Sequence, residues 1–243
     1  MQLHHPAEAL SIGRDTRNEL SSIRILNKET NAESDIPCTK ILIAAGVWSP
    51  KVFSTLFPTA KETLPISSVA GHSLVVRSPR WTKEHEEEGS HAVFSTDEEG
   101  FCPEIFSRYG GDIYVAGLNS STLPFPNLAT ESNVDDSQIK KLQQTAKRLL
   151  GASDTSDDLE IVRKGLCFRP VTEKGTPIVS KIPDEVLGVV ERRPGEDGGV
   201  WLAAGHGPWG ISHSLGTGKV MAEMIQGKRT SVDVGDLELE SYR

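Results

Sequence analysis

A glycine-rich turn close to the C-terminus is the feature of this sequence that most clearly suggests chemistry. The segment GHGPWGISHSLGTGK, at residues 205–219, holds five glycines and follows the apolar run VWLAAG, at residues 200–205. Such a turn presents backbone N–H groups just ahead of a helix, whose positive end favours a negatively charged group. The alternative is that the glycines only permit tight turns, because Gly is common at turns.

A second apolar run, ILIAAG at residues 41–46, ends in the same Ala-Ala-Gly. Continuous apolar runs of this length are typical of strands buried on both faces, as in a parallel sheet. Small residues at the end of such a strand let a ligand approach the backbone, and ligands of α/β sheets bind at that end. We therefore expect Gly46 and Gly205 to meet at one ligand site, which their placement on opposite sides of the molecule would exclude.

The remaining elements must position these turns. Ser49-Pro50 indicates a helix start, and the stretch between the two runs alternates strand patterns with charged or Gly-rich turns, as in a mostly antiparallel sheet. The acidic run 84–88 is expected to be a solvated loop or helix face, and the polar tail from Gly227 is expected to fray. Strands are predicted at residues 22–26, 41–46, 66–78, 92–96, 112–119, 160–172, 178–182 and 200–205, and helices at 51–57, 135–150 and 216–226.

Composition excludes several classes of protein. The 243 residues are 37% hydrophobic and 25% charged, which is typical of a globular chain. A net charge of -8 argues against nucleic acid as a partner. The longest apolar stretch, residues 41–48, is too short to span a membrane, and the N-terminus shows no secretory signal. The three cysteines form no CxxC pair and no metal-ligand spacing, so we expect no metal site and a cytoplasmic location.

The two glycine-ended runs also resemble a known family. ILIAAGVWSP is similar to the second FAD-contacting motif of the D-amino acid oxidase, glycine oxidase and sarcosine oxidase family. GLCFRPVTEKGTPIVS, followed by VWLAAGHGPWGISHSLGTGKVMAEMI, resembles that family's C-terminal signature, most of all in fungal oxidoreductases of unassigned substrate. The resemblance implies an α/β (or α+β) fold. It would comprise an incomplete FAD-binding Rossmann-like domain at residues 1–60 and 163–243, and a mostly antiparallel substrate domain at 61–162.

The resemblance also implies where FAD would lie. Gly46 would pass the ribityl and pyrophosphate region, with Trp48 and Ser49 shaping the turn, and the later turn would line the flavin ring. Ordinary packing is the alternative for Trp48, and a hydrogen bond that holds the turn is the alternative for His206. The residues implied to contact the cofactor are Ala45, Gly46, Trp48, Ser49, Gly205, His206, Gly207, Trp209, Gly210 and Ile211.

Arg169 and Cys167 lie in the motif that precedes the flavin turn. Arg169 resembles the arginine that pairs with the substrate carboxylate in amino-acid oxidases, since a guanidinium binds a carboxylate bidentately. A structural ion pair is the alternative. Cys167 stands at a place similar to the flavin-linking cysteine of sarcosine oxidases, but we expect a buried, inert thiol. The substrate-side Tyr of amino-acid oxidases has no clear equivalent, and Phe101 occupies that neighbourhood.

The function implied is FAD-dependent oxidation of a CH–NH bond in a small amine or amino acid, by hydride transfer to the flavin, with oxygen as the expected oxidant of the reduced flavin. The family opens with a strand, a GxGxxG turn and a helix, whereas GxGxxG occurs nowhere in these residues. We therefore expect a truncated chain. The alternative is a non-catalytic relic or interaction protein that no longer binds FAD.

Overall fold

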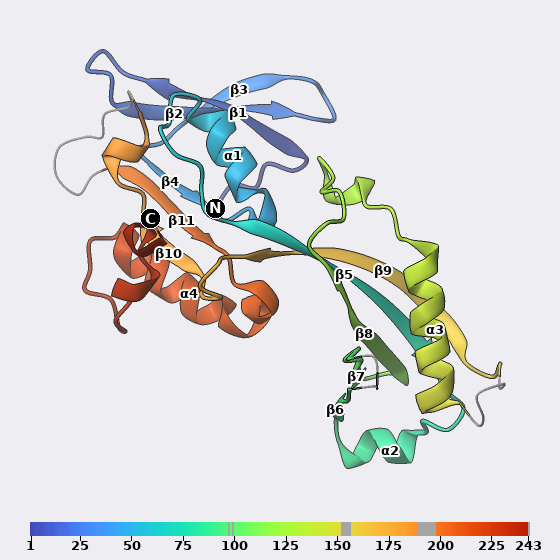
Figure 1. Cartoon of the computed structure of the whole chain (residues 1–243). Coiled ribbons are helices and arrows are strands. Elements are labelled where there is room, and N and C mark those ends of the chain that lie inside the picture. Colours follow the sequence, from blue (N-terminus) through green and yellow to red (C-terminus); the bar gives the residue numbers. More distant parts are fainter. Residues whose placement is uncertain (97, 99, 152–156, 189–197, 243) are drawn as a thin grey trace. The chain divides into compact units, whose positions relative to one another are not determined.

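The chain folds into two compact units. The computed structural model describes residues 1–96, 98, 100–151, 157–188 and 198–242 (Figure 1). The first unit comprises Met1–Ser67 and Arg169–Arg243, and the second comprises Ser68–Phe168. From the sequence, the boundaries between the two domains were predicted after residues 60 and 162, a few residues before those in the structure. Each unit has a hydrophobic core of its own, and the mixed α/β fold with antiparallel sheets agrees with the predicted class.

The first unit is built around a three-stranded sheet in the order β10-β11-β4. Strands β4 (Lys40–Ile43) and β11 (Gly199–Ala204) run parallel, while β10 (Ile178–Lys181) runs antiparallel to β11. Each parallel strand leads through a single 3-10 turn, η1 (Gly46–Trp48) or η4 (Gly207–Trp209), into a helix. Helix α1 (Ser49–Leu56) follows β4, and helix α4 (Gly210–Ile225) follows β11.

Different elements cover the two faces of this sheet. On one face, Ile43 and Leu202 pack with Phe53 of α1 and with a second sheet. On the other face, Trp201 packs against Met221 of α4. The second sheet is antiparallel, with strands β1 (Ala7–Arg14), β2 (Leu20–Asn27) and β3 (Glu33–Pro37). The sequence predicted only the middle strand, because ESDIP of β3 is polar and almost wholly exposed and therefore lacks an apolar face to recognise.

The second unit contains a five-stranded sheet in the order β6-β7-β8-β5-β9. Helix α3 (Asp136–Leu150) covers one face, with Ile139 and Leu142 packed against Leu74 and Val115. The neighbours from β6 to β5 pair antiparallel, as predicted. The acidic run forms a short exposed helix, α2 (Lys83–Glu88). The strands are β5 (Ser67–Arg77), β6 (Ala92–Phe94), β7 (Glu104–Ser107), β8 (Asp112–Ser120) and β9 (Glu160–Val171).

Two local predictions are wrong. Helix α4 begins at Gly210 rather than at residue 216, so Gly216 and Gly218 lie inside it. A glycine inside a helix costs only about 1 kcal/mol, which tertiary packing overrides. The C-terminal tail does not fray over its last turns: Leu239 is buried in the main core, and the Tyr242 hydroxyl donates to the carbonyl of Pro177 at 3.0 Å. No helix in the described part of the chain is both long and apolar enough to cross a lipid bilayer.

Candidate cofactor site

The two Ala-Ala-Gly turns lie next to each other at one edge of the first unit's sheet. Ile43 of β4 is paired with Leu202 of β11, and the strands are parallel. Gly46 and Gly205 stand at the same offset beyond these paired residues, so both turns leave the carboxyl ends of neighbouring strands (Figure 1). This register confirms that the two turns are adjacent, and the shared ligand site stays a prediction. Carboxyl ends of parallel strands are where ligands of open α/β sheets bind.

The backbone of both turns requires glycine. Gly46, Gly205 and Gly207 have φ angles of 56°, 87° and 55°, in the left-handed region that side chains disfavour. A Cβ on Gly205 would also lie 2.8 Å from the methyl group of Thr172, whereas a Cβ on Gly46 would meet no atom within 4 Å. Gly205 therefore packs closely against the chain, while the backbone at Gly46 borders open space that a ligand could fill.

Two helix N-termini follow these turns, and neither is capped by a side chain. The N-cap positions are occupied by Trp48 before α1 and by Trp209 before α4, with no side-chain hydrogen bond to the first turn. An indole offers a donor only and cannot accept from a backbone N–H, in contrast to the usual Ser, Thr, Asp or Asn. Neither helix has an acidic residue in its first turn. The edge therefore offers two positive dipole ends to an anionic group, while at the start of α1 the N–H of Ser49 already donates to the carbonyl of Gly46 and Pro50 has none.

His206 ties the second turn to its helix. Its Nε2 lies 3.0 Å from Oγ1 of Thr217, two turns into α4. Burial lowers the pKa of His206, and the nearby His213 lowers it further. The imidazole is therefore neutral near pH 7. The bond to Thr217 supports the interpretation that His206 holds the turn, rather than transferring a proton.

The other predicted cofactor residues differ in exposure. Ala45 and Trp48 are half-buried. The Ser49 side chain is fully buried, and its hydroxyl has no hydrogen-bond partner among the described residues. It can shape the turn by packing, but the side chain itself does not reach a surface. Trp209 and Ile211 are 59% and 94% exposed. The two turns thus share a backbone design, while their side chains are buried at the first and open at the second.

Arg169 and Cys167 fall on either side of the boundary between the units. Arg169 belongs to the first unit, is half-buried and already has an interaction partner within the chain. The structural alternative to a substrate anchor therefore stays open. Cys167 belongs to the second unit and is exposed, so the prediction of a buried thiol is wrong. Its Sγ lies 3.7 Å from the carbonyl oxygen of Gly71 on the neighbouring strand β5. Phe101 packs against the core beneath α3, with Lys141 Nζ 5.0 Å from its ring.

Two residues that support the site were not predicted. Lys40, at the start of β4, donates to the carbonyl of Ile225 at the C-terminal end of α4, at 2.8 Å. Thr172 donates to the carbonyl of Thr176 at 2.6 Å, which fixes the methyl group that lies against Gly205. No sequence signal points to Lys40, because its partner lies far away in the chain. Thr172 could have been found as the last residue of the FRPVT motif.

Comparison with known proteins identifies the family. The family model described as FAD dependent oxidoreductase matches residues 1–224. The chain belongs to the FAD dependent oxidoreductase family. Members of this family bind FAD, and the open glycine edge with two uncapped helix N-termini fits an anionic cofactor of that kind.

Relatives within the family are substantially longer. TDA3 of Saccharomyces cerevisiae is 25% identical over 84% of this chain and 35% of its own length, and C1F5.03c of Schizosaccharomyces pombe is 27% identical over 93% and 51%. The names of both describe oxidoreductases. A D-amino acid dehydrogenase of Rhizorhabdus wittichii is 29% identical over 91% of this chain and 45% of its own length. The chain therefore spans about half the length, or less, of these relatives.

Solved structures show the same fold. Glycine oxidase from Geobacillus kaustophilus matches 96% of this chain and 51% of its own, with a TM-score of 0.67 and 20% identity. The iminodiacetate oxidase of Chelativorans sp. BNC1 matches 94% and 51%, with a TM-score of 0.66 and 15% identity. At these identities the likeness concerns the fold alone.

Proposed function

We propose that residues 1–243 form part of an FAD-dependent amine or amino-acid oxidase that oxidises a CH–NH bond. The observation that carries this proposal is the placement of Gly46 and Gly205 at the carboxyl ends of adjacent parallel strands, each leading into an uncapped helix N-terminus. Membership of the FAD dependent oxidoreductase family supports it, as do relatives named for D-amino acid dehydrogenation.

Each part of the chain has a distinct task in this proposal. When bound, FAD supplies the acceptor for the hydride that leaves the substrate carbon. The backbone donors at the starts of α1 and α4 hold its anionic groups, and the glycines let it approach the backbone. His206 keeps the second turn in place as a neutral imidazole. Arg169 is the candidate anchor for a substrate carboxylate, which would compete with its present partner in the chain.

We further propose that cofactor binding requires an additional strand and helix from outside residues 1–243. Strand β4 ends the sheet on one side, although parallel strands are normally covered. Leu42 is 42% exposed, whereas Trp201, its partner in the register, is 3% exposed beneath α4. Beside this uncovered face, α4 carries an exposed stripe of apolar and small residues at helical spacing: Ile211, Leu215, Gly218 and Ala222. An additional strand paired with β4 and an additional helix packed on the stripe would bury Leu42 and the exposed apolar residues of α4.

Flavin binding tests both parts of this proposal. The chain alone should bind FAD weakly, and a fusion to the part of C1F5.03c that this chain does not match should be yellow and show flavin absorbance. Replacing Gly46 by valine in the fusion should abolish the colour, because a branched side chain would fill the space kept open there. The matched control is Gly110→Val, in a hairpin turn of the second unit, which should keep the colour. A correctly folded fusion without flavin would refute the proposal.

Catalysis separates an enzyme from a non-catalytic relic. The flavin-loaded fusion should release peroxide, or reduce a dye, with at least one member of a panel of small amines and amino acids. Replacing Arg169 by lysine should raise KM for amino acids much more than for amines, because only the amino acids carry the carboxylate that a guanidinium fork would bind. A fusion that binds FAD and turns over no member of the panel would favour the relic.

A further inference from the structure

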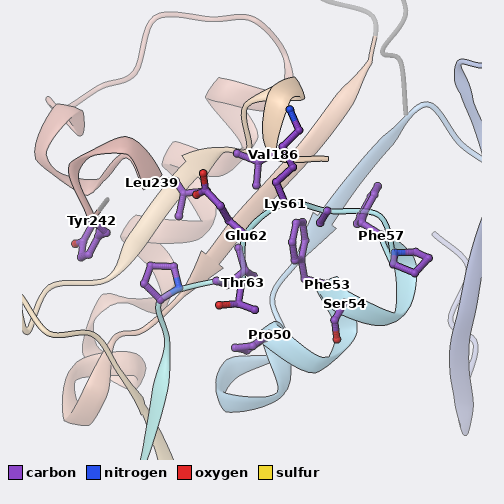
Figure 2. Close-up of a pocket in the computed structure, with 14 residues that line it drawn as sticks. Pro50, Phe53, Ser54, Phe57, Lys61, Glu62, Thr63, Val186, Leu239 and Tyr242 are labelled. Atoms are coloured by element: carbon purple, nitrogen blue, oxygen red, sulfur yellow. The ribbon is translucent and has the colours of Figure 1, made fainter. Parts of the chain in front are cut away.

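The first unit contains a cavity of about 510 Å³ that none of the predicted cofactor residues lines (Figure 2). It lies beside α1, along the segment 57–65 that follows this helix. Leu239 and Tyr242 of the C-terminal tail close another side. The volume falls within the range of about 300–1,000 Å³ that is typical of small-molecule sites. The cavity therefore has the size of a ligand site and is separate from the glycine edge.

The wall of this cavity combines apolar and polar surface, and its apolar part is firmly held. Phe53 and Phe57 are fully buried, and their ring centroids are 5.3 Å apart. Pro50, Pro58 and Pro65 contribute further apolar surface with restricted backbones. Tyr242 is held by its hydroxyl bond to the carbonyl of Pro177 at 3.0 Å. The apolar part of this wall favours a compact ligand with an apolar body, because burying apolar surface is favourable, and the polar part favours a ligand that also carries a polar group.

The mouth of the cavity carries one charged side chain that makes no ion pair with a described residue. Lys61 is exposed and makes no ion pair with any residue that the structure describes. Glu62 already has an interaction within the chain. In Figure 2 the Lys61 side chain extends toward Val186, whereas that of Glu62 extends toward Leu239, so the two charges lie on different sides of the opening. An anion is therefore the group that this mouth can still bind.

We propose that this cavity binds a small carboxylate with an apolar body, which lies against Pro50, Pro65 and Tyr242, while its carboxylate lies at Lys61. A single lysine matches a single negative charge, and the neighbouring Glu62 and the net charge of -8 disfavour more highly charged anions such as phosphate. An apolar amine is disfavoured because Lys61 would repel it. Since Leu239 and Tyr242 form one wall, an occupant also stabilises the C-terminal tail.

Binding of phenylacetate to the intact chain tests this proposal, with 2-phenylethylamine as the probe of opposite charge. Phenylacetate should bind and the amine should not, as measured by calorimetry and by amide chemical shifts of residues 57–65. Lys61→Gln should weaken phenylacetate binding at least about fivefold at low salt. The matched control Lys140→Gln removes an exposed lysine from α3 of the second unit and should leave the affinity unchanged. Circular dichroism should show that both variants are folded.

Two further measurements separate this site from the cofactor site. Ser54→Phe places a ring at the cavity wall from an exposed position of α1 and should abolish phenylacetate binding. Phenylacetate should slow hydrogen exchange of residues 235–242, and FAD should not compete with it. The proposal is overturned if phenylacetate does not bind, if the amine binds equally well, or if Lys61→Gln binds as tightly as the unchanged chain. None of these outcomes depends on flavin binding.

Discussion

The turn after β4 and the turn after β11 have the same backbone design but opposite surroundings. Both contain Ala-Ala-Gly, pass through one 3-10 turn, which begins at Gly46 in the first and at Gly207 in the second, and enter a helix whose N-cap is a tryptophan. The helix after the first turn buries Ser49, Phe53 and Leu56, whereas the first two turns of α4 after the second expose Ile211 and Leu215. One turn is therefore fixed by the core of this chain, and the other presents a surface. The same local motif is thus buried in the core at one strand and exposed at the next.

The largest expected effect concerns the two helices themselves. Phe53→Ala should lower the free energy of unfolding by about 3–5 kcal/mol, because it leaves a cavity in the main core. Ile211→Ser should change it by less than about 0.5 kcal/mol in the same urea titration, because that side chain is exposed. In the flavin-binding fusion, Ile211→Ser should instead weaken FAD binding. A large loss of stability for Ile211→Ser in the chain alone would contradict the distinction between a buried start of α1 and an exposed start of α4.

The glycines at the two turns should also respond differently. Gly46→Ala should cost about 1–2 kcal/mol of stability, since only the left-handed backbone opposes it. Gly205→Ala should cost roughly 1–3 kcal/mol more, because its Cβ would press on the methyl group of Thr172 as well. Thermal unfolding of both variants measures the difference. The double change Gly205→Ala with Thr172→Ser should recover part of the loss, and no recovery would assign the cost to backbone strain alone.

Lys40 joins strand β4 to helix α4, and replacing it should have a smaller effect on stability. Its ammonium group donates to the carbonyl of Ile225, which joins the start of β4 to the end of α4. Lys40→Met keeps the aliphatic stem and should cost about 1 kcal/mol in chemical unfolding. Lys219→Met is the control, because the ion pair of Lys219 with Glu223 in the same helix is a long surface contact of 3.9 Å. Equal effects of the two changes would show that the bond to Ile225 contributes nothing specific.

The smallest expected effect is the pH dependence of the α4 turn. The folded-state pKa of His206 is lowered, so the unfolded chain binds more protons as the pH falls below about 6.5. The contribution of His206 to the free energy of unfolding is therefore fully present above pH ~6.5 and declines as the pH falls below that value. The buried His72 of the second unit has a lowered pKa too, and its Nε2 accepts from the backbone N–H of Asp135 at 3.1 Å. His206→Gln should flatten the profile only in part, as followed by urea unfolding from pH 5 to 8, and an unchanged profile would contradict the role of His206.

Sequence patterns alone located the parts of the fold that depend on local apolar character. The runs before Gly46 and Gly205 are continuous and apolar, as is typical of strands in a parallel sheet, and they form the parallel pair. Helix α3 was predicted almost to the residue, since Asp135 caps it and Gly151 ends it. The polar strand β3 carries no such signal, because its pairing with β2 rather than its composition makes it a strand. The start of α4 at Gly210 carries none either, because glycines inside a helix are locally unfavourable.

The sequence by itself determined the family and the two glycine turns, because these follow from residue types at fixed spacing. Only the tertiary structure decided how each residue is used. It buries Ser49, exposes Cys167, packs Phe101 beneath α3 and anchors the tail through Leu239. The physical reason is that burial depends on which segments distant in the chain come together. The spacing of residues within one segment does not contain that information.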